Sequence, residues 1–172
     1  MTETRAAPAD IQPGTMKALL AAPVRPGKLV WIGLRLKRQE PVVSAQSAML
    51  VASRGIEGDH YQTARDGARQ VTVISSEEIA AIASYLGRDA VAPDILRRNL
   101  VVRGINLSAL KGARFSIGSA VLEYSGPCAP CSHMEAALGT GGYNAVRNHG
   151  GITARIIEGG EITIGDAVVR IT

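Results

Sequence analysis

Apolar residues in this chain fall into short runs separated by Gly, Pro and polar residues, which is typical of β-strands joined by turns. The run 70–74 is rich in β-branched residues, which fit a pleated sheet. The step Gly159-Gly160 lies between two such runs and predicts a two-residue hairpin that pairs them. The strands that we expect are 16–24, 28–36, 41–52, 70–74, 100–102, 113–117, 120–124, 152–157, 161–164 and 167–171.

Helical patterns are confined to a few segments. The clearest is 75–87, which opens with Ser75 and Glu78 spaced as a capping box and then repeats apolar residues at the spacing of one helix face. Pro93 predicts the start of a second, short helix that ends at Arg98. A third helix is expected at 132–138.

Many short strands with glycines at their corners, few helices and no βαβ alternation predict a mostly β fold of the α+β type. We expect a closed or half-closed β-barrel with a few short helices, and the helix 75–87 covering one opening. The Ala- and Pro-rich residues 1–15 are expected to be a disordered N-terminal tail, and 16–172 to form one barrel domain.

Composition narrows the choice of partner. The net charge is +4, and basic residues are concentrated between 25 and 38, where a solvated basic face is the simplest interpretation. Aromatic residues make up only 3% of the chain, so the stacking residues of a nucleic-acid surface are missing, and an anionic small molecule is the more economical partner. No apolar run approaches the ~20 residues that span a bilayer, and the first fifteen residues lack an apolar export signal, so we expect a cytoplasmic protein with reduced thiols and no membrane partner.

Both cysteines of the chain lie in one motif, Cys128-Ala-Pro-Cys131-Ser-His133. No other segment concentrates soft and ionisable atoms in this way. Cys131 directly precedes the expected helix 132–138, whose free N–H groups favour a thiolate, so Cys131 is the better placed sulfur for metal ligation or nucleophilic attack.

The motif by itself is open to four interpretations. It could be a redox disulfide between Cys128 and Cys131, two ligands of a structural zinc site, a pair of small buried thiols, or one working thiolate with a second cysteine beside it. A second segment, 55–60, ends in Asp59 and His60 between glycines. It is either a loop at the barrel rim or a loop that projects these two side chains into a site.

Several stretches of the chain resemble the MOSC domain, named for the C-terminal domain of molybdenum-cofactor sulfurases. They follow the family's order over roughly residues 16–172, and the likeness is greatest to small stand-alone bacterial members. The matching stretches are Gly55-Ile-Glu-Gly-Asp-His60, Arg69-Gln70-Val71, Arg97-Arg98-Asn99-Leu100, Gly112 with Ile117-Gly118, Pro127-Cys128 with Cys131, Gly151-Ile-Thr-Ala-Arg155, Gly159-Gly-Glu-Ile162 and Gly165-Asp166.

The resemblance implies a β-barrel and a cysteine that carries sulfur or binds the molybdenum of a molybdopterin cofactor. That cysteine matches Cys131, and Cys128 becomes its neighbour or a disulfide partner that would remove the ligand. His60 and His133 are expected to supply protons, because imidazoles titrate near neutral pH. The side chains expected at the cofactor's phosphate and pterin edges are Arg69, Arg98, Asn99 and Arg155.

Two functions follow from the resemblance. The first is a reductase of N-hydroxylated compounds at a Cys131-ligated molybdenum centre, served by an electron-donor protein. The second is a carrier that holds sulfur on Cys131 as a persulfide, supplied by a sulfur-donor protein, or that passes the cofactor on. Family reductases carry an additional domain, and only about fifteen residues precede the expected barrel here. We therefore expect a homodimer that completes the pocket, a loosely held cofactor, or a protein that does not hold the cofactor permanently and lacks it as purified.

Overall fold

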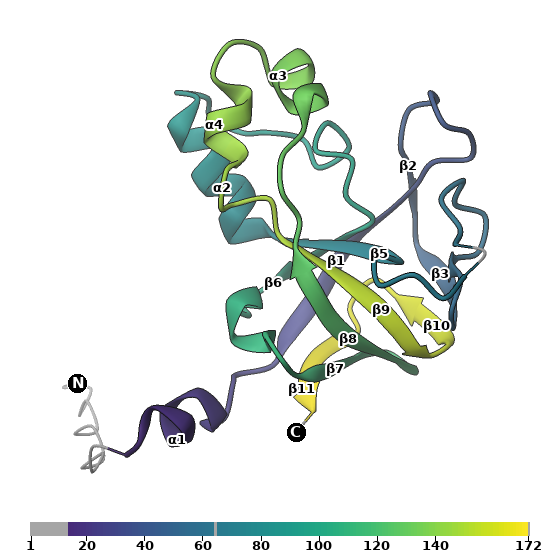
Figure 1. Ribbon diagram of the computed structural model, residues 1–172. Coiled ribbons are helices and arrows are strands. Elements are labelled where there is room, and N and C mark those ends of the chain that lie inside the picture. The colour runs from purple at the N-terminus through teal and green to yellow at the C-terminus, as the bar shows by residue number, and fades with distance from the viewer. Residues whose placement is uncertain (1–13, 64, 172) are drawn as a thin grey trace, which may run out of the picture.

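Seven strands close into a barrel in the computed structural model, which describes residues 14–63 and 65–171 (Figure 1). Around the barrel the order is β1, β6, β5, β9, β8, β7 and β11, and β11 pairs back with β1. The expected mostly β barrel is therefore confirmed, in its closed form. The strands are β1 Gly27–Leu34, β5 Val71–Ser75, β6 Leu100–Arg103, β7 Arg114–Ile117, β8 Ala120–Pro127, β9 Ile152–Glu158 and β11 Ala167–Ile171.

One pair of barrel strands, β5 and β6, is parallel, whereas the other barrel pairs are antiparallel. Parallel neighbours need a long crossover connection, and here it contains helix α2 (Ser76–Tyr85). The expected absence of βαβ alternation therefore fails at one place, where β5, α2 and β6 form a single parallel crossover.

A second sheet of three strands packs beside the barrel, formed by β3 (Ser47–Val51), β4 (Gly55–Ile56) and β10 (Gly160–Thr163). β10 pairs with β3, so the predicted hairpin between 152–157 and 161–164 is wrong. Gly159 and Gly160 do bend the chain after β9. They allow it to pass close to Leu50 and Ser119, where a Cβ would come within 2.7 Å and 2.4 Å of those residues' atoms.

The expected strand 41–52 is divided in two. β2 (Val43–Ala45) pairs antiparallel with the end of β1, and β3 begins only two residues later in the second sheet. Local sequence predicts extended backbone over this segment, but it does not predict that neighbouring halves join different sheets.

The first helices show where local signals succeed and fail. The capping box of α2 is confirmed, because the Ser75 hydroxyl accepts from Glu78 N–H and the Glu78 carboxylate accepts from Ser75 N–H, both at 3.1 Å. Residues 16–24 were predicted to be a strand, and this is wrong, since they contain α1 (Met16–Ala21), capped by Thr15. α1 extends away from the barrel and buries none of its side chains (Figure 1). The apolar run 16–24 was therefore not a sign of a strand packed in a sheet.

The remaining short helices lie in the connections. α3 (Ser132–Leu138) forms where it was predicted, and α4 (Gly142–Val146) and the 3₁₀ helix η1 (Leu107–Leu110) were not predicted. Residues 93–97 form turns in place of the expected helix 93–98, and Arg97 has a positive φ that ends any helical path. The expected tail 1–15 lies outside the described residues, apart from Gly14 and Thr15.

The chain has two apolar cores on opposite sides of β5 and β6. Val73 and Val102 point into the barrel interior, and Ile74 and Val101 point outward to a second cluster with the helices. That second cluster includes Ile82 of α2, Met134 and Leu138 of α3, and Val146 of α4. The helix α2 thus packs on outward-facing strand residues as part of a helical layer, and does not cap a barrel opening as expected (Figure 1).

Candidate functional site

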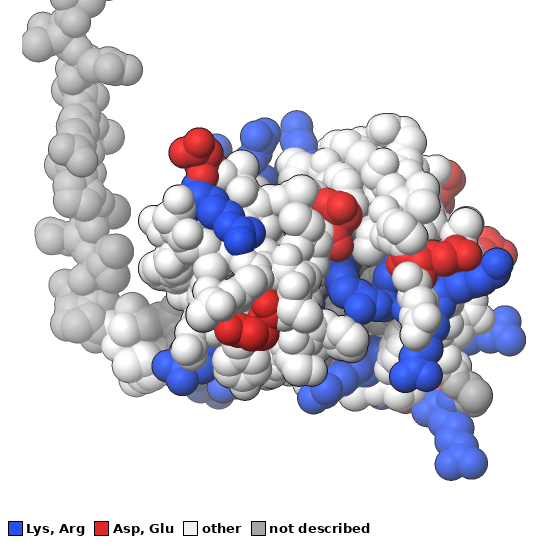
Figure 2. Space-filling view, turned by 90° about the horizontal axis from the view of Figure 1, so that it is seen from above, with Lys and Arg blue, Asp and Glu red and all other residues white. Residues whose placement is uncertain are grey.

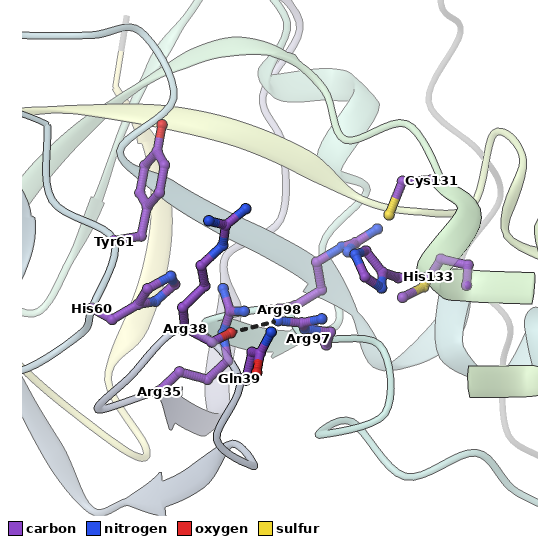
Figure 3. A pocket seen from close by; sticks show the side chains of 10 residues that line it. Arg35, Arg38, Gln39, His60, Tyr61, Arg97, Arg98, Cys131 and His133 are labelled. Carbon is purple, nitrogen blue, oxygen red and sulfur yellow. Dashed lines mark hydrogen bonds between the residues drawn. The ribbon is translucent and has the colours of Figure 1, made fainter. Parts of the chain in front are cut away.

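Two adjoining cavities lie where β1, the loop after β4, the segment before β6 and the segment after β8 come together. The larger one, which we name the Cys131 cavity, has a volume of about 510 Å³ (Figure 3). Its wall is formed by Arg35, Arg38, Gln39, His60, Tyr61, Arg97, Arg98, Cys131, His133 and Met134. In Figure 3, Cys131, His133 and Arg98 lie on one side, His60 and Tyr61 lie on the other, and the side chain of Arg38 lies between them.

The smaller one, the Cys128 cavity, has a volume of about 270 Å³. It shares Arg35, Tyr61 and Arg97 with the Cys131 cavity, so the two are compartments of one site. The residues that line only this compartment are Asp59, Arg69, Gln70, Val71, Thr72, Asn99, Cys128 and Thr153.

Most of the side chains selected from the sequence meet in this site. Cys131, His133, His60 and Arg98 line the Cys131 cavity, although more than 70 residues separate the first and last of them in the sequence. Cys128, Arg69 and Asn99 line the Cys128 cavity. The fold therefore brings the two cysteines to two different compartments.

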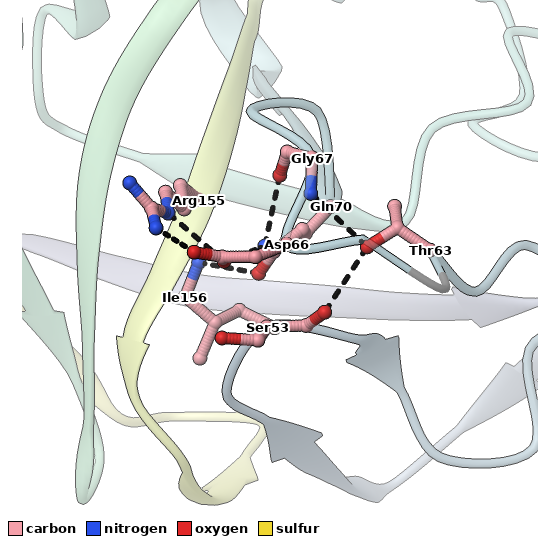
Figure 4. Close-up of polar contacts among 7 residues, drawn as sticks. All are labelled: Ser53, Thr63, Asp66, Gly67, Gln70, Arg155 and Ile156. Atoms are coloured by element: carbon pink, nitrogen blue, oxygen red, sulfur yellow. Dashed lines mark hydrogen bonds and ion pairs between the residues drawn. The ribbon is translucent and has the colours of Figure 1, made fainter.

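Arg155 does not join this group. Its guanidinium forms an ion pair with the carboxylate of Asp66, which also accepts from the amide of Gln70 (Figure 4). The side chain is on β9 but lines neither cavity. In this structure Arg155 anchors the loop that carries Asp66, and its expected cofactor contact stays a prediction.

Asp59 fixes the loop that carries His60. Its side chain is 6% exposed, and its carboxylate accepts from Arg35 N–H at 2.7 Å and from Tyr61 N–H at 3.2 Å. His60 N–H in turn donates to the Arg35 carbonyl at 2.6 Å. Of the two side chains that this loop was expected to project, His60 lines the Cys131 cavity, and Asp59 lines the other compartment with its carboxylate occupied by backbone groups.

Two consecutive arginines face the Cys131 cavity because Arg97 has left-handed backbone, with φ 56°. Successive residues of an extended segment point to opposite sides, and the turn at Arg97 removes this restriction. Left-handed backbone is unfavourable for a residue with a Cβ, so the surrounding structure must stabilise it. Strain of this kind is typical of functional sites.

Arg98 is 7% exposed and only partly hydrogen-bonded. Its Nε donates to the Gly150 carbonyl and its Nη1 to the Leu96 carbonyl, both at 2.8 Å. The buried Nη2 has no partner among the described residues, and neither does the buried Nδ1 of His60. Buried donors and acceptors are almost always paired, so two unpaired nitrogens on residues of one cavity are unusual.

Asn99 is more constrained than the sequence suggested. Its Oδ1 accepts from both the backbone N–H and the hydroxyl of Thr72, and its Nδ2 donates to the Gly33 carbonyl at 3.4 Å. These bonds tie β1 and β5 to the segment that enters β6. Asn99 thus positions the neighbouring arginines, and its acceptor oxygen is already in use.

The two thiols have different surroundings. Cys131 is exposed and is the N-cap residue of α3, whereas Cys128 is half-buried and its N–H donates to the Gly151 carbonyl at 2.8 Å. Burial raises the pKa of the Cys128 thiol, and the guanidiniums of Arg98 and Arg69 act in the opposite direction. Both cysteines are free thiols. Reagents and ligands in the cavity reach Cys131 more readily than Cys128.

The sequence analysis missed Arg35, Arg38 and Arg97 as site residues. The first two belong to the basic segment 25–38, which was interpreted as a solvated face. Figure 2 shows Lys and Arg side chains on several parts of the face seen from above, most densely on its right. Sequence alone does not distinguish the cavity arginines from the surface ones. The adjacent pair Arg97-Arg98 was the one local signal for an anion site.

The geometry agrees with a comparison to known proteins. The family model of the MOSC domain matches residues 40–169. This chain belongs to the MOSC domain family. No curated protein matches it, but solved structures do.

Among these, the YuaD protein from Bacillus subtilis superposes with a TM-score of 0.74 at 21% identity, over 84% of this chain and 95% of that one. YiiM from Escherichia coli gives a TM-score of 0.65 at 20% identity, over 84% of this chain and 70% of that one. YiiM from Geobacillus stearothermophilus gives 0.61 at 18%, over 85% and 75%. At these identities the likeness establishes that this MOSC protein shares their fold. Within the described ranges, none of its helices has the length and apolar character to cross a membrane.

Proposed function

We propose that this MOSC protein binds a molybdenum cofactor across its two cavities and reduces N-hydroxylated compounds in the Cys131 cavity. The observation that carries the proposal is the buried, unpaired Nη2 of Arg98 beside an accessible thiol. A buried polar group without a partner costs roughly 1–3 kcal/mol, which a bound anion with several acceptor oxygens offsets.

The residues present fit the cofactor's anionic parts. Arg35 and Arg97 line both compartments and Arg98 lies beside them, so three guanidiniums are available to one phosphate group. Guanidinium forks match phosphate oxygens in a bidentate way. Among the described residues that line the Cys131 cavity, none is Asp or Glu, and both carboxylate oxygens of Asp59, in the other compartment, already accept backbone N–H groups.

The same residues fit a metal that brings most of its own ligands. The described part of the chain contains no group of three or more His, Cys, Asp and Glu side chains placed to hold a metal ion. A soft thiolate suits the sulfur-rich coordination of molybdenum, and Cys131 is the accessible thiol of the cavity. When bound, the cofactor supplies the two-electron redox chemistry.

The histidines have the positions needed for proton supply. Reduction of R–NH–OH to R–NH₂ and water consumes two electrons and two protons, and the electrons come from a donor protein. His60 and His133 lie on opposite sides of the cavity, where their imidazoles can exchange protons with a bound substrate (Figure 3). Together they provide a proton source on either side of the substrate.

The test is molybdenum content by elemental analysis of protein purified from a host that makes the cofactor. We expect molybdenum in the wild-type protein and its loss, by tenfold or more, in Cys131→Ser. Cys128→Ser is the matched control, because it removes the neighbouring thiol that lines the other compartment. Reduction of an aryl amidoxime with a chemical electron donor is then measured on the loaded protein. Equal molybdenum in all three proteins would contradict ligation by Cys131.

The exposure of Cys131 favours one second candidate, a sulfur carrier with a persulfide on this residue. An accessible thiol in a cavity lined by guanidiniums suits sulfur transfer between proteins. Intact-mass analysis distinguishes the two functions. A gain of one sulfur atom, removed by a reductant and absent in Cys131→Ser, supports the carrier, and molybdenum without such a gain supports the reductase.

A further inference from the structure

The Cys131 cavity has an unbalanced charge. Four guanidiniums and two imidazoles line it, and among the described lining residues there is no carboxylate. The nearest buried carboxylate is that of Asp59, in the other compartment, and both its oxygens accept backbone N–H groups. Charges of one sign in a concave site raise the local concentration of ligands of opposite sign.

Arg38 is the exposed member of the four arginines, on a loop that follows β1. Like Arg98, it lines the Cys131 cavity and not the Cys128 cavity. Its carbonyl accepts from Arg97 Nη2 at 3.3 Å, which links the loop to the cavity wall. Its own guanidinium forms no hydrogen bond or ion pair with the described residues, and Figure 3 shows it directed across the cavity. Arg38 thus presents a free cation to whatever enters.

We propose that the substrate of this cavity carries a carboxylate or phosphate group in addition to its reducible N–O group, and that Arg38 recognises this anion. The proposal rests on the proposed function for the N–O group. The proposal narrows the expected substrates from N-hydroxylated compounds in general to N-hydroxylated compounds that carry a negative charge. Arg38 is then a specificity residue, while Arg35, Arg97 and Arg98 remain for the cofactor.

Alkylation of Cys131 tests the cavity without the cofactor. Full-length protein from a host that lacks the cofactor is treated with iodoacetate, an anion, or iodoacetamide, its neutral analogue, and each rate at Cys131 is obtained by peptide mapping. The ratio of the two rates is divided by the same ratio for glutathione. We expect this normalised ratio to be about tenfold above one at low ionic strength and to fall toward one in 0.5 M salt, because salt screens the field over about 4 Å.

The variants are Arg38→Gln and, as the matched control, Lys37→Gln. Lys37 is adjacent in the same loop, has the same charge and an 81% exposed side chain, and does not line the cavity. We expect Arg38→Gln to lower the normalised ratio about threefold or more and Lys37→Gln to leave it unchanged. A wild-type ratio near one, or equal losses in the two variants, overturns the proposal. Circular dichroism verifies that both variants are folded.

A substrate pair links the cavity to turnover. On the cofactor-loaded protein, we expect kcat/KM for 4-carboxybenzamidoxime to exceed that for benzamidoxime about tenfold. In Arg38→Gln, we expect KM for 4-carboxybenzamidoxime to rise more than KM for benzamidoxime. If neither compound is reduced but the alkylation ratio behaves as expected, the proposed function fails and the anion site stands. If both are reduced without preference and the alkylation ratio is near one, the function stands and the anion proposal is wrong.

Discussion

The barrel interior and the wall of the Cys131 cavity differ in the kind of groups that they bury. In the interior, Phe115, Leu29 and Ile32 are fully buried among other apolar side chains. On the cavity wall, Arg98 is buried with an unpaired nitrogen, and Arg97 adopts left-handed backbone. The interior thus stabilises the fold, whereas the wall holds groups at a cost that only a ligand offsets. The difference predicts opposite responses to substitution in the two regions.

The largest effect is expected in the interior. Phe115 is the one phenylalanine of the chain and is 0% exposed, so Phe115→Ala leaves a cavity and should lower the free energy of unfolding by about 3–5 kcal/mol. Urea denaturation measures the change. Phe115→Leu keeps most of the volume and serves as the control, with a smaller loss. A loss below about 1 kcal/mol for the alanine variant contradicts the assigned core.

The next largest effect is expected in the loop after β4, which contains Asp59 and His60. Asp59→Asn weakens the acceptor for Arg35 N–H and Tyr61 N–H, and we expect a loss of about 1–3 kcal/mol in the free energy of unfolding. Asp89→Asn makes the same chemical change at an exposed position and controls for it. Hydrogen exchange should show faster opening of residues 57–61 in the Asp59 variant alone. Equal behaviour of the two variants contradicts the role of Asp59.

On the cavity wall the sign is reversed. Arg97→Gly relieves left-handed backbone, and we expect the protein to become more stable by up to about 1 kcal/mol while losing cationic charge at both cavities. Thermal unfolding measures the gain, and the normalised alkylation ratio at Cys131 should fall. Arg97→Ala removes the same charge but keeps a Cβ, so it should lower the ratio without the gain in stability. Destabilisation by the glycine variant would show that the side chain stabilises the fold more than its backbone strain costs.

The smallest effect is a pH dependence from Cys128. Because burial raises the pKa of this thiol in the folded protein, its contribution to stability is fully present below the unfolded pKa and is lost as the pH rises through the folded pKa. The free energy of unfolding should therefore fall slightly in alkaline solution, and less so in Cys128→Ser. Urea denaturation at pH 7 to 10 measures it, with Cys131→Ser for comparison. Identical pH slopes in the wild type and Cys128→Ser contradict the burial effect.

The sequence predicted correctly those elements that are determined by neighbouring residues in the chain. The capping box at Ser75 and Glu78 forms α2, the β-branched run forms β5, and the glycine-marked short strands form a barrel. Local sequence patterns gave wrong predictions where the structure of a segment depends on what it packs or pairs with. The apolar residues 16–21 form an exposed helix, and β10 leaves its neighbour β9 to pair with β3. The turn propensity of Gly159-Gly160 was not enough to pair β10 with β9, because the edge of the second sheet at β3 was available to β10.

The candidate site shows the same division. The sequence by itself determined the pair of cysteines, the histidine beside them, and the family motifs that contain His60, Arg69 and Arg98, because chemistry-bearing residue types in fixed spacing are visible in one dimension. The tertiary structure decided which arginines face the cavities. It places Arg155 outside both cavities, paired with Asp66, and brings Arg35, Arg38 and Arg97 to their walls. The physical reason is that a guanidinium's role depends on burial and on the nearest carboxylate, and both are set by segments distant in sequence.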